Sequence, residues 1–349
     1  MSNDDILILK GQEIATLLDG RELEIVDAVR LAYMAHAQGK SSLPHSTFLR
    51  FPDNEKDRII ALPAYLGDGF GVAGIKWISS FTGNLSKGMD RASAILILNS
   101  TETGRPEAIM EGSVISAKRT AASAALAAHT LLAGRVVTSV GMLGCGLINY
   151  ETAKFLRAVC PELRRLAIFD LDQQRAHQFK ETCADLFAEI VVTEEPRALY
   201  RDNALIAFAT TAVKPHVFDL SDCVPGSIVL HTSLRDLSAE VILASDNVVD
   251  DVDHVSRAQT SIHLAEQVTG DRSFVRCTLG DILLGHANAR ENGKPVTVFS
   301  PFGLGVLDVA LGKLVCELSR NENVGSTINS FLPESWIGKG KATAAPALQ

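Results

Sequence analysis

Apolar runs alternate with amphipathic segments through the middle of the chain. The strand-like runs occupy residues 136–143, 164–170, 189–192, 204–211, 227–231 and 246–250. Helix-like segments at 147–158 and 172–187 separate the first three of these runs. Strands that alternate with helices favour a parallel sheet with helices on both faces. This part of the chain is therefore predicted to be a doubly wound α/β domain.

The chain before this region has a different pattern. Residues 22–38 carry apolar positions at helical spacing, and residues 46–97 contain short β-rich runs separated by turns. An alanine-rich segment at 116–133 is predicted to be helical, as is the segment at 303–318. We expect this last helix to return to the first domain. The fold class is then α/β, with a Rossmann sheet joined to an α+β domain.

Composition narrows the function classes. A chain of 349 residues suits about two domains. The net charge of -8 argues against a general nucleic-acid binder, and no apolar run is long enough to cross a membrane. The N-terminus lacks the pattern of a signal peptide, so we expect a cytoplasmic protein. The six cysteines are scattered, which favours reduced thiols over disulfides or zinc, and no metal site is predicted.

A glycine turn follows the first strand of the α/β region. Gly144 and Gly146 let the backbone approach a pyrophosphate where a helix begins, at Leu147, Ile148 and Asn149. The third position of the fingerprint is Asn149 rather than glycine, and an ordinary strand-helix turn is the alternative interpretation. Asp170 ends the next strand, where a carboxylate binds ribose hydroxyls and favours NAD over NADP. Thr210 and Thr211 end a further strand at the same edge and are candidate cofactor contacts.

Several charged residues are candidates for chemistry. Lys76 interrupts an apolar strand, and from the residues alone a solvent-facing lysine is favoured. Arg119 begins a helix of small residues and offers a planar fork to a carboxylate, although Lys118 and Arg119 also suit a charged helix end. His45, Ser46 and Arg50 are predicted to lie on one edge strand. His231 follows a strand, and a structural and a catalytic role are equally compatible with its position.

The order of these motifs resembles the ornithine cyclodeaminase/μ-crystallin family of NAD(P)-dependent enzymes. The matching stretches are Leu62-Pro-Ala-Tyr-Leu-Gly, Gly74-Ile-Lys76, Thr103-Gly-x-Pro, Arg119-Thr-Ala-Ala-Ser-Ala, Gly141-x-x-Gly-x-Gly with Asp170, and Phe302-Gly-Leu-Gly-x-x-Asp308. They cover about residues 40–318. The arginine motif just before a Rossmann loop is the most specific of them.

The resemblance implies a homodimer with a small amino acid substrate. A substrate-binding and dimerisation domain would comprise residues 1–130 and 310–349, and residues 131–309 would bind NAD. Lys76 matches the family's active-site lysine, and Arg119 matches an arginine that bridges substrate and cofactor. His45, Ser46 and Arg50 join them in the predicted substrate site. Ser93, His231, Ser233 and Ser300 are also assigned to the predicted cofactor site.

Two departures bear on the reaction. The family commonly has an arginine near position 46, whereas here the nearest is Arg50. Ornithine cyclodeaminases also carry an aspartate for the substrate amine. The matching stretch here runs from Val229 to Leu237 without it, since Asp236 aligns with a later acidic position. This departure argues against cyclisation of ornithine.

The stretches around His45, Gly88, His231 and Val249 resemble the branch that makes L-2,3-diaminopropionate for siderophores and non-ribosomal peptides. That branch oxidises N-(1-amino-1-carboxy-2-ethyl)-L-glutamate with NAD and releases 2-oxoglutarate. Lys76, Arg119 and Arg50 would receive its carboxylates, and His231 or Lys76 would act as the base. The alternatives are another amino or imino acid dehydrogenase, such as a ketimine reductase or alanine dehydrogenase-like enzyme, an ornithine cyclodeaminase, or a non-catalytic nucleotide-binding protein of the μ-crystallin kind.

Overall fold

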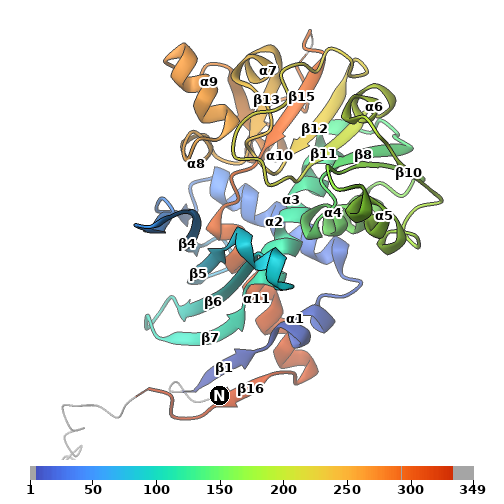
Figure 1. Cartoon of the computed structure of the whole chain (residues 1–349). Coiled ribbons are helices and arrows are strands. Elements are labelled where there is room, and N and C mark those ends of the chain that lie inside the picture. The colour runs from blue at the N-terminus through green and yellow to red at the C-terminus, as the bar shows by residue number, and fades with distance from the viewer. Residues whose placement is uncertain (1–4, 292, 333–349) are drawn as a thin grey trace, which may run out of the picture.

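Two eight-stranded sheets form the framework of the molecule (Figure 1). The structure is a computed structural model that describes residues 5–291 and 293–332. Sheet A lies at one end of the molecule and sheet B at the other, with long helices between them. Among the described helices, none is both long and apolar enough to span a bilayer.

Sheet B is entirely parallel and has the order β10-β9-β8-β11-β12-β15-β13-β14. Its strands are β8 (Ser139–Leu143), β9 (Arg165–Phe169), β10 (Glu189–Val192), β11 (Leu205–Phe208), β12 (Ser227–His231), β13 (Asp246–Val249), β14 (Val275–Thr278) and β15 (Val296–Ser300). The strand order reverses at β8, which creates the crevice where doubly wound sheets bind dinucleotides. The predicted fold class is confirmed. β14 and β15 were not predicted.

Both faces of sheet B are buried. Alternate residues of β8 and β11 point to opposite sides: Val140 and Leu205 join one apolar cluster, whereas Leu143 and Ile206 join the other. The covering helices are α4 (Leu147–Val159), α5 (Gln173–Thr182), α6 (Pro196–Asp202), α7 (Ala239–Ala244), α8 (Val252–Val255), α9 (Ser261–Thr269) and α10 (Leu279–Leu283). Burial on both faces explains why these strands are nearly continuous apolar runs in the sequence.

Sheet A is mixed and has the order β16-β1-β7-β6-β5-β4-β2, with β3 also paired to β4. Its strands are β1 (Ile6–Leu9), β2 (Ser41–Ser42), β3 (Thr47–Phe51), β4 (Asn54–Leu66), β5 (Val72–Ser80), β6 (Ala92–Ser100), β7 (Pro106–Glu111) and β16 (Ser326–Ile328). A 3₁₀ segment, Thr82–Lys87, joins β5 to β6. The β-rich prediction for residues 46–97 is confirmed, whereas β1, β2, β7 and β16 were missed.

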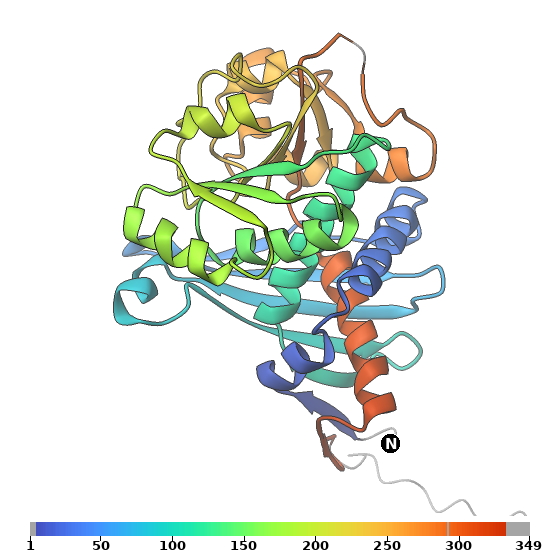
Figure 2. The same ribbon diagram turned by 90° about the vertical axis from the view of Figure 1, so that its right-hand side faces the viewer.

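Long helices join the two sheets into one core. α2 (Glu22–Ala37), α3 (Ser113–Leu132) and α11 (Gly305–Glu322) lie along the inner face of sheet A, and α1 (Gly11–Leu17) packs at one end (Figure 2). A single apolar cluster includes inner residues of sheet A, all three long helices and one face of sheet B. The predicted return of the C-terminal helix to sheet A is confirmed. The division of the chain into domains at 131 and 309 stays a prediction.

Candidate active site

The glycine turn after β8 has the backbone geometry that a pyrophosphate site needs. Gly144 has φ +95°, and a Cβ atom at this position would stand 2.5 Å from the carbonyl oxygen of Ala209. Only glycine fits so close to β11. A Cβ atom at Gly146 would instead meet nothing within 4 Å. No side chain caps the N-terminus of α4 at Gly146, so its N–H groups are available to an anion.

Asn149 occupies the third position of the glycine fingerprint, where glycine is usual, and its side chain stabilises the turn. Its side-chain amide donates hydrogen bonds to the carbonyl oxygens of Leu143 (3.0 Å) and Gly144 (2.7 Å), and the residue is buried. These bonds tie the first turn of α4 to the end of β8. Asn149 therefore stabilises the turn through side-chain hydrogen bonds, which a glycine cannot form.

Asp170 lies where the ribose-binding carboxylate is expected. One of its oxygens accepts a hydrogen bond from the backbone N–H of Cys145 (2.7 Å), and the other accepts one from Asp172 N–H (3.0 Å). The side chain is thus held beside the glycine turn, and each oxygen retains a lone pair for a ribose hydroxyl. The turn, the helix N-terminus and this carboxylate fit NAD, which would lie across the end of β8.

Lys76 and Arg119 converge on one buried carboxylate. The Nζ atom of Lys76 lies 2.9 and 2.8 Å from the two carboxylate oxygens of Asp308 on α11, and 3.0 Å from Ser116 Oγ. Arg119 Nε donates to the same Asp308 carboxylate at 3.0 Å. Asp308 is completely buried, and Lys76 is 2% exposed. While Lys76 is protonated, two cations share one anion, so the cluster then keeps a net positive charge that suits a substrate carboxylate.

This burial changes the acidity of Lys76. Desolvation lowers the pKa of the lysine, the nearby Arg119 lowers it further, and Asp308 offsets part of the effect, leaving the pKa at about 8. A substantial fraction of the amine is therefore neutral in mildly alkaline solution. A lysine with these properties suits both carboxylate binding and proton transfer.

The interpretation of these cations from single residues was wrong. Lys76 was expected to face solvent, yet it points to the inner face of sheet A, where Asp308 compensates its charge. Lys118 and Arg119 do not form an exposed helix end, because both are buried. Lys118 turns away to Glu151 (3.3 Å) and the ring of Phe155. α3 begins three residues earlier than predicted, so these side chains lie within the helix.

Asp250 holds the turn that leads into α11. Its carboxylate accepts hydrogen bonds from the backbone N–H groups of Phe302 (2.8 Å) and Gly303 (2.7 Å), and it is buried. Burial raises its pKa above the usual range. Gly303 has φ +91°, and a Cβ atom there would lie 2.7 Å from the Arg119 guanidinium. The turn thus positions both Arg119 and the start of the helix that carries Asp308.

His231 lies in a closed polar cluster. One ring nitrogen is 3.2 Å from Ser300 Oγ, and the other is 3.2 Å from the Asp236 carboxylate. Thr210, Ser233 and His216 also bond Asp236. Burial would raise the pKa of Asp236, but the hydrogen bonds from His216, His231 and Ser233 hold it far below its usual range. The structure therefore brings these predicted residues together around Asp236.

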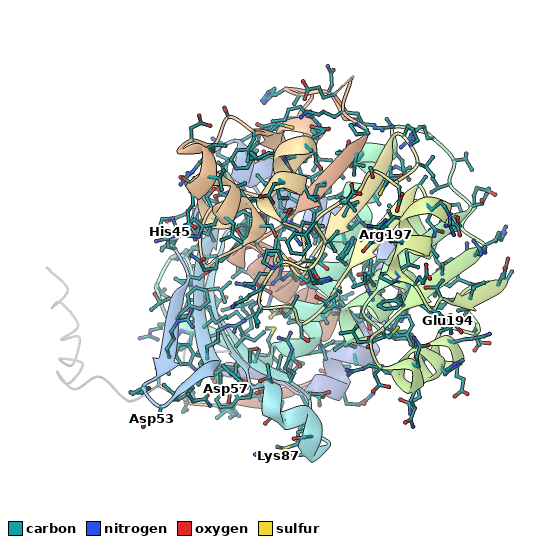
Figure 3. The ribbon with its side chains drawn as sticks, turned by 45° about the horizontal axis from the view of Figure 1, so that its top comes forward. His45, Asp53, Asp57, Lys87, Glu194 and Arg197 are labelled. Carbon is teal, nitrogen blue, oxygen red and sulfur yellow. The ribbon has the colours of Figure 1, made fainter. Side chains whose placement is uncertain are left out.

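The remaining predicted residues lie at several places. His45 and Ser46 precede β3, so the edge strand begins later than predicted; His45 packs against His254, with 5.1 Å between ring centroids (Figure 3). Arg50 lies on β3 beside Phe48. Ser93 faces the outer side of sheet A, where its hydroxyl is 2.9 Å from that of Ser79. Thr211 and Leu147 are exposed at the edge of sheet B, and Ile148 is half-buried beside them.

Sequence reasoning missed residues that complete the site. Asp308 appeared only as part of a family motif, although an acid within an apolar helix is itself a signal. Asp236 was noted as a later acidic position, yet it is the centre of the His231 cluster. No single-sequence signal linked Ser116 to Lys76, because the contact depends on how α3 packs against β5.

The fold and the glycine turn define a dinucleotide-dependent oxidoreductase, in which Lys76 and Arg119 form a buried cationic cluster around Asp308. The chain belongs to the Ornithine cyclodeaminase/mu-crystallin family, whose sequence signature matches residues 8–323. This family includes NAD-dependent amino and imino acid dehydrogenases and reductases, which act on CH–NH bonds. The prediction of an NAD-dependent amino acid dehydrogenase is confirmed at this level.

Two curated relatives align over nearly the whole chain. An alanine dehydrogenase of Archaeoglobus fulgidus is 30% identical over 94% of this chain and 99% of its own length. The N-((2S)-2-amino-2-carboxyethyl)-L-glutamate dehydrogenase of Staphylococcus aureus is 28% identical over 94% of this chain and 100% of its own length. The chain is thus similar to both relatives to nearly the same degree.

Two solved structures share the fold over full length. The Δ(1)-pyrroline-2-carboxylate reductase of Thermococcus litoralis, in complex with NADH and L-proline, has a TM-score of 0.86, 25% identity and coverage of 93% of this chain and 100% of its own. An archaeal alanine dehydrogenase dimer with bound NAD has a TM-score of 0.83, 29% identity and coverage of 93% and 99%. These relatives confirm NAD as the cofactor of the group to which the chain belongs.

Proposed function

We propose that this protein uses NAD to oxidise N-(1-amino-1-carboxy-2-ethyl)-L-glutamate and releases L-2,3-diaminopropionate and 2-oxoglutarate. The observation that carries the proposal is the convergence of Lys76 and Arg119 on Asp308, which places an arginine with unused donors for a substrate carboxylate beside a lysine that can exchange a proton. The full-length similarity to the S. aureus dehydrogenase supports this substrate. The product would enter siderophore or non-ribosomal peptide synthesis.

The reaction balances as an oxidation followed by hydrolysis. NAD, when bound, accepts the hydride from the glutamyl Cα of the substrate. The substrate amine gives up its proton, so that a C=N bond forms. Water then adds to that carbon, and the C–N bond breaks to give 2-oxoglutarate and the free amine of 2,3-diaminopropionate.

Lys76 and Arg119 divide the work in this reaction. Arg119 binds the carboxylate next to the reacting carbon, because its guanidinium retains donors beyond the one used by Asp308. Lys76, in its neutral form, takes the proton from the amine and releases it to solvent. It then takes a proton from the attacking water and returns it to the leaving nitrogen. His231 is the weaker candidate for the base, since both of its ring nitrogens already have partners. We assign it to positioning the ends of β12 and β15.

A parallel assay tests the reaction. The purified protein with NAD is given the glutamate adduct, alanine or ornithine, and NADH formation is followed by absorbance. We expect turnover of the adduct, with 2-oxoglutarate and 2,3-diaminopropionate as products. Turnover of alanine alone would support the alternative suggested by the A. fulgidus relative. Tight binding of NAD without any turnover would support a non-catalytic nucleotide-binding protein.

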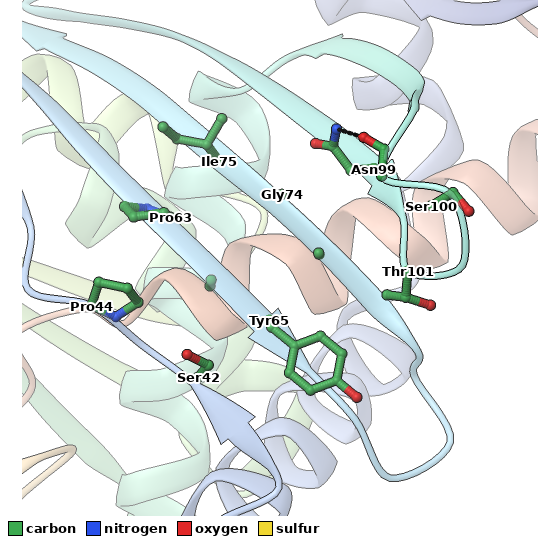
Figure 4. A pocket seen from close by; sticks show the side chains of 12 residues that line it. Ser42, Pro44, Pro63, Tyr65, Gly74, Ile75, Asn99, Ser100 and Thr101 are labelled. Atoms are coloured by element: carbon green, nitrogen blue, oxygen red, sulfur yellow. Dashed lines mark hydrogen bonds between the residues drawn. The ribbon is translucent and has the colours of Figure 1, made fainter.

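We also propose a homodimer formed through the outer face of sheet A. The side chains of Tyr65, Trp77 and Ile95 are 41%, 37% and 43% exposed on that face. Beside them, residues of β4, β5 and β6 line a shallow hollow of about 520 Å³, whose floor includes Pro63 and Ile75 (Figure 4). An apolar sheet face of this kind suits a second copy of the chain, and the similar alanine dehydrogenase is a dimer.

Trp77→Arg is expected to convert the dimer to a monomer. The charge would lie in the middle of the apolar face, opposite Ala61 and Ile95 of the neighbouring strands. Light scattering after size exclusion measures the mass. Val268→Arg introduces the same charge at an exposed apolar position on α9 and should leave the mass unchanged. A wild-type protein that is already monomeric would contradict the proposal.

A further inference from the structure

Four arginines gather at one end of sheet A, beyond the Lys76 cluster. Arg50 on β3 and Arg58 on β4 are direct cross-strand partners, so their side chains leave the sheet on the same face. Arg58 is paired in turn with Ser80 on β5, whose hydroxyl accepts a hydrogen bond from Arg91 (3.2 Å). The fourth, Arg235, follows β12 in sheet B and donates to the carbonyl oxygen of Ala258 (2.8 Å).

The positive charges of this cluster are not balanced within the part of the chain that the structure describes. None of the four arginines forms an ion pair with a carboxylate of residues 5–291 or 293–332. Burial lowers the pKa of Arg58, and the charges of Arg235, Arg91 and Arg50 lower it further. Burial and Arg50 likewise lower the pKa of Arg235. Facing like charges destabilise a sheet, so an anion bound there would relieve a cost present in the free protein.

The two nearest carboxylates have other partners. Asp57, at the same end of β4 (Figure 3), accepts hydrogen bonds from Asn54 Nδ2 (2.7 Å) and Thr82 N–H (3.0 Å). Asp236 is occupied by the His231 cluster. Both carboxylates reduce the local positive charge, but neither forms an ion pair with one of the four arginine side chains.

The arginine cluster and Lys76 share the inner face of sheet A. Lys76 and Ser80 are four residues apart on β5, which corresponds to about 13 Å along the strand. On β4, Leu62 lies opposite Lys76, and Arg58 lies opposite Ser80. Lysine and arginine side chains both extend several ångströms from the backbone. The distance between the Lys76 cluster and the guanidinium groups can therefore match the distance between the two carboxylates of a small dicarboxylate.

We propose that Arg50, Arg58, Arg91 and Arg235 form a second anion-binding subsite, which receives the substrate carboxylate farthest from the reacting carbon. This inference rests on the proposed function, because it assigns a place to the side-chain carboxylate of the glutamyl part. Guanidinium groups bind carboxylates through two parallel hydrogen bonds, and three of the four are half-buried, which strengthens such bonds. Since Arg235 comes from sheet B, a bound polycarboxylate would also join the two sheets.

The subsite would separate the two leading substrate candidates. A tricarboxylate reaches both the Lys76 cluster and the arginines. Alanine has one carboxylate, which Arg119 and Lys76 bind, and it leaves the arginines without an anion. The subsite therefore predicts selection by the number and spacing of carboxylates.

The test compares two ligands that differ by one carboxylate. We would measure the dissociation constants of 2-oxoglutarate and 2-oxovalerate from the NADH-bound wild-type protein, and from Arg58→Gln and Arg50→Gln with NADH bound. The wild type should prefer 2-oxoglutarate, and each variant should lose about tenfold or more of that preference. Arg197→Gln changes an exposed arginine on α6 that pairs with Asp222, and it should keep the preference. The Tm of Arg58→Gln should stay equal or rise, because a repelling charge is removed.

The outcomes separate this subsite from the proposed reaction. If the protein turns over the glutamate adduct while both variants keep the wild-type preference, the subsite is wrong and the reaction stands. If the adduct is not a substrate but the preference for 2-oxoglutarate depends on Arg58 and Arg50, the subsite stands and the reaction is wrong. Equal affinity of the wild type for the two acids would overturn the subsite directly.

Discussion

Lys76→Met is expected to lower kcat/KM for the amine substrate by about 10²–10⁴-fold, the usual loss when a positioned acid-base group is removed. Methionine fills a similar volume, and Asp308 keeps Arg119 as its counter-ion at 3.0 Å, so folding should be preserved. Arg119→Met should lower kcat/KM as strongly through lost carboxylate binding. Initial rates of NADH formation with saturating NAD measure both effects.

The pH profile distinguishes a proton-transfer role of Lys76 from a binding role. Desolvation and Arg119 lower the lysine pKa to about 8. If the neutral amine is the base, the oxidation rate rises as pH increases through about 8 and then levels. That step is expected to disappear in Lys76→Arg, because arginine stays protonated.

Lys118→Met is the matched control for these two variants. It removes a buried cation one residue from Arg119, but Lys118 pairs with Glu151 and not with Asp308. It should change stability more than turnover. Wild-type turnover in Lys76→Met and Arg119→Met would show that the reaction occurs elsewhere.

Gly144→Ala should destabilise the protein even in the absence of NAD. The new Cβ atom would stand 2.5 Å from the carbonyl oxygen of Ala209, and φ is +95°. Because the clash is with backbone, β8 and β11 would have to separate, at a cost of about 2 kcal/mol or more. Thermal unfolding of the NAD-free protein should show a lower Tm.

Gly146→Ala, at the same turn, is expected to weaken NAD binding without changing the stability of the NAD-free protein. Its Cβ atom meets nothing within 4 Å, so the Tm without NAD should be unchanged. The affinity for NAD should nevertheless fall, since the methyl group would occupy space that a pyrophosphate needs. An equal loss of Tm in both variants would contradict the geometry of the turn.

Most of sheet B was predictable because most of its strands are marked by a pattern within their own short stretches of sequence. Strands such as Ser139–Leu143 and Ser227–His231 are short apolar runs bounded by turns, and the glycine turn marks the cofactor edge. Several of the missed strands have partners that are remote in sequence, although β7 pairs with its neighbour β6. β16 pairs with β1 from the opposite end of the chain, and β15 enters between β12 and β13.

The candidate site was predictable in its members but not in their arrangement. The contact between Lys76 and Asp308 joins residues 232 positions apart, so the burial of the lysine could not be inferred from its own strand. The arginine cluster was represented by Arg50 alone. Recognising Arg58 requires the β3–β4 register, and recognising Arg235 requires the packing of sheet B against sheet A.

The position of Asp308 so late in the chain has a consequence during synthesis. Sheet A is complete from β2 to β7 by residue 111, but α11, which covers its inner face, begins only at Gly305. At about 5–20 residues per second, the ribosome needs on the order of ten seconds or more to deliver that helix. During this interval the nascent chain exposes apolar surface around a lysine without its counter-ion. Synthesis that stops before α11 should therefore leave an aggregation-prone fragment and a natural substrate for chaperones.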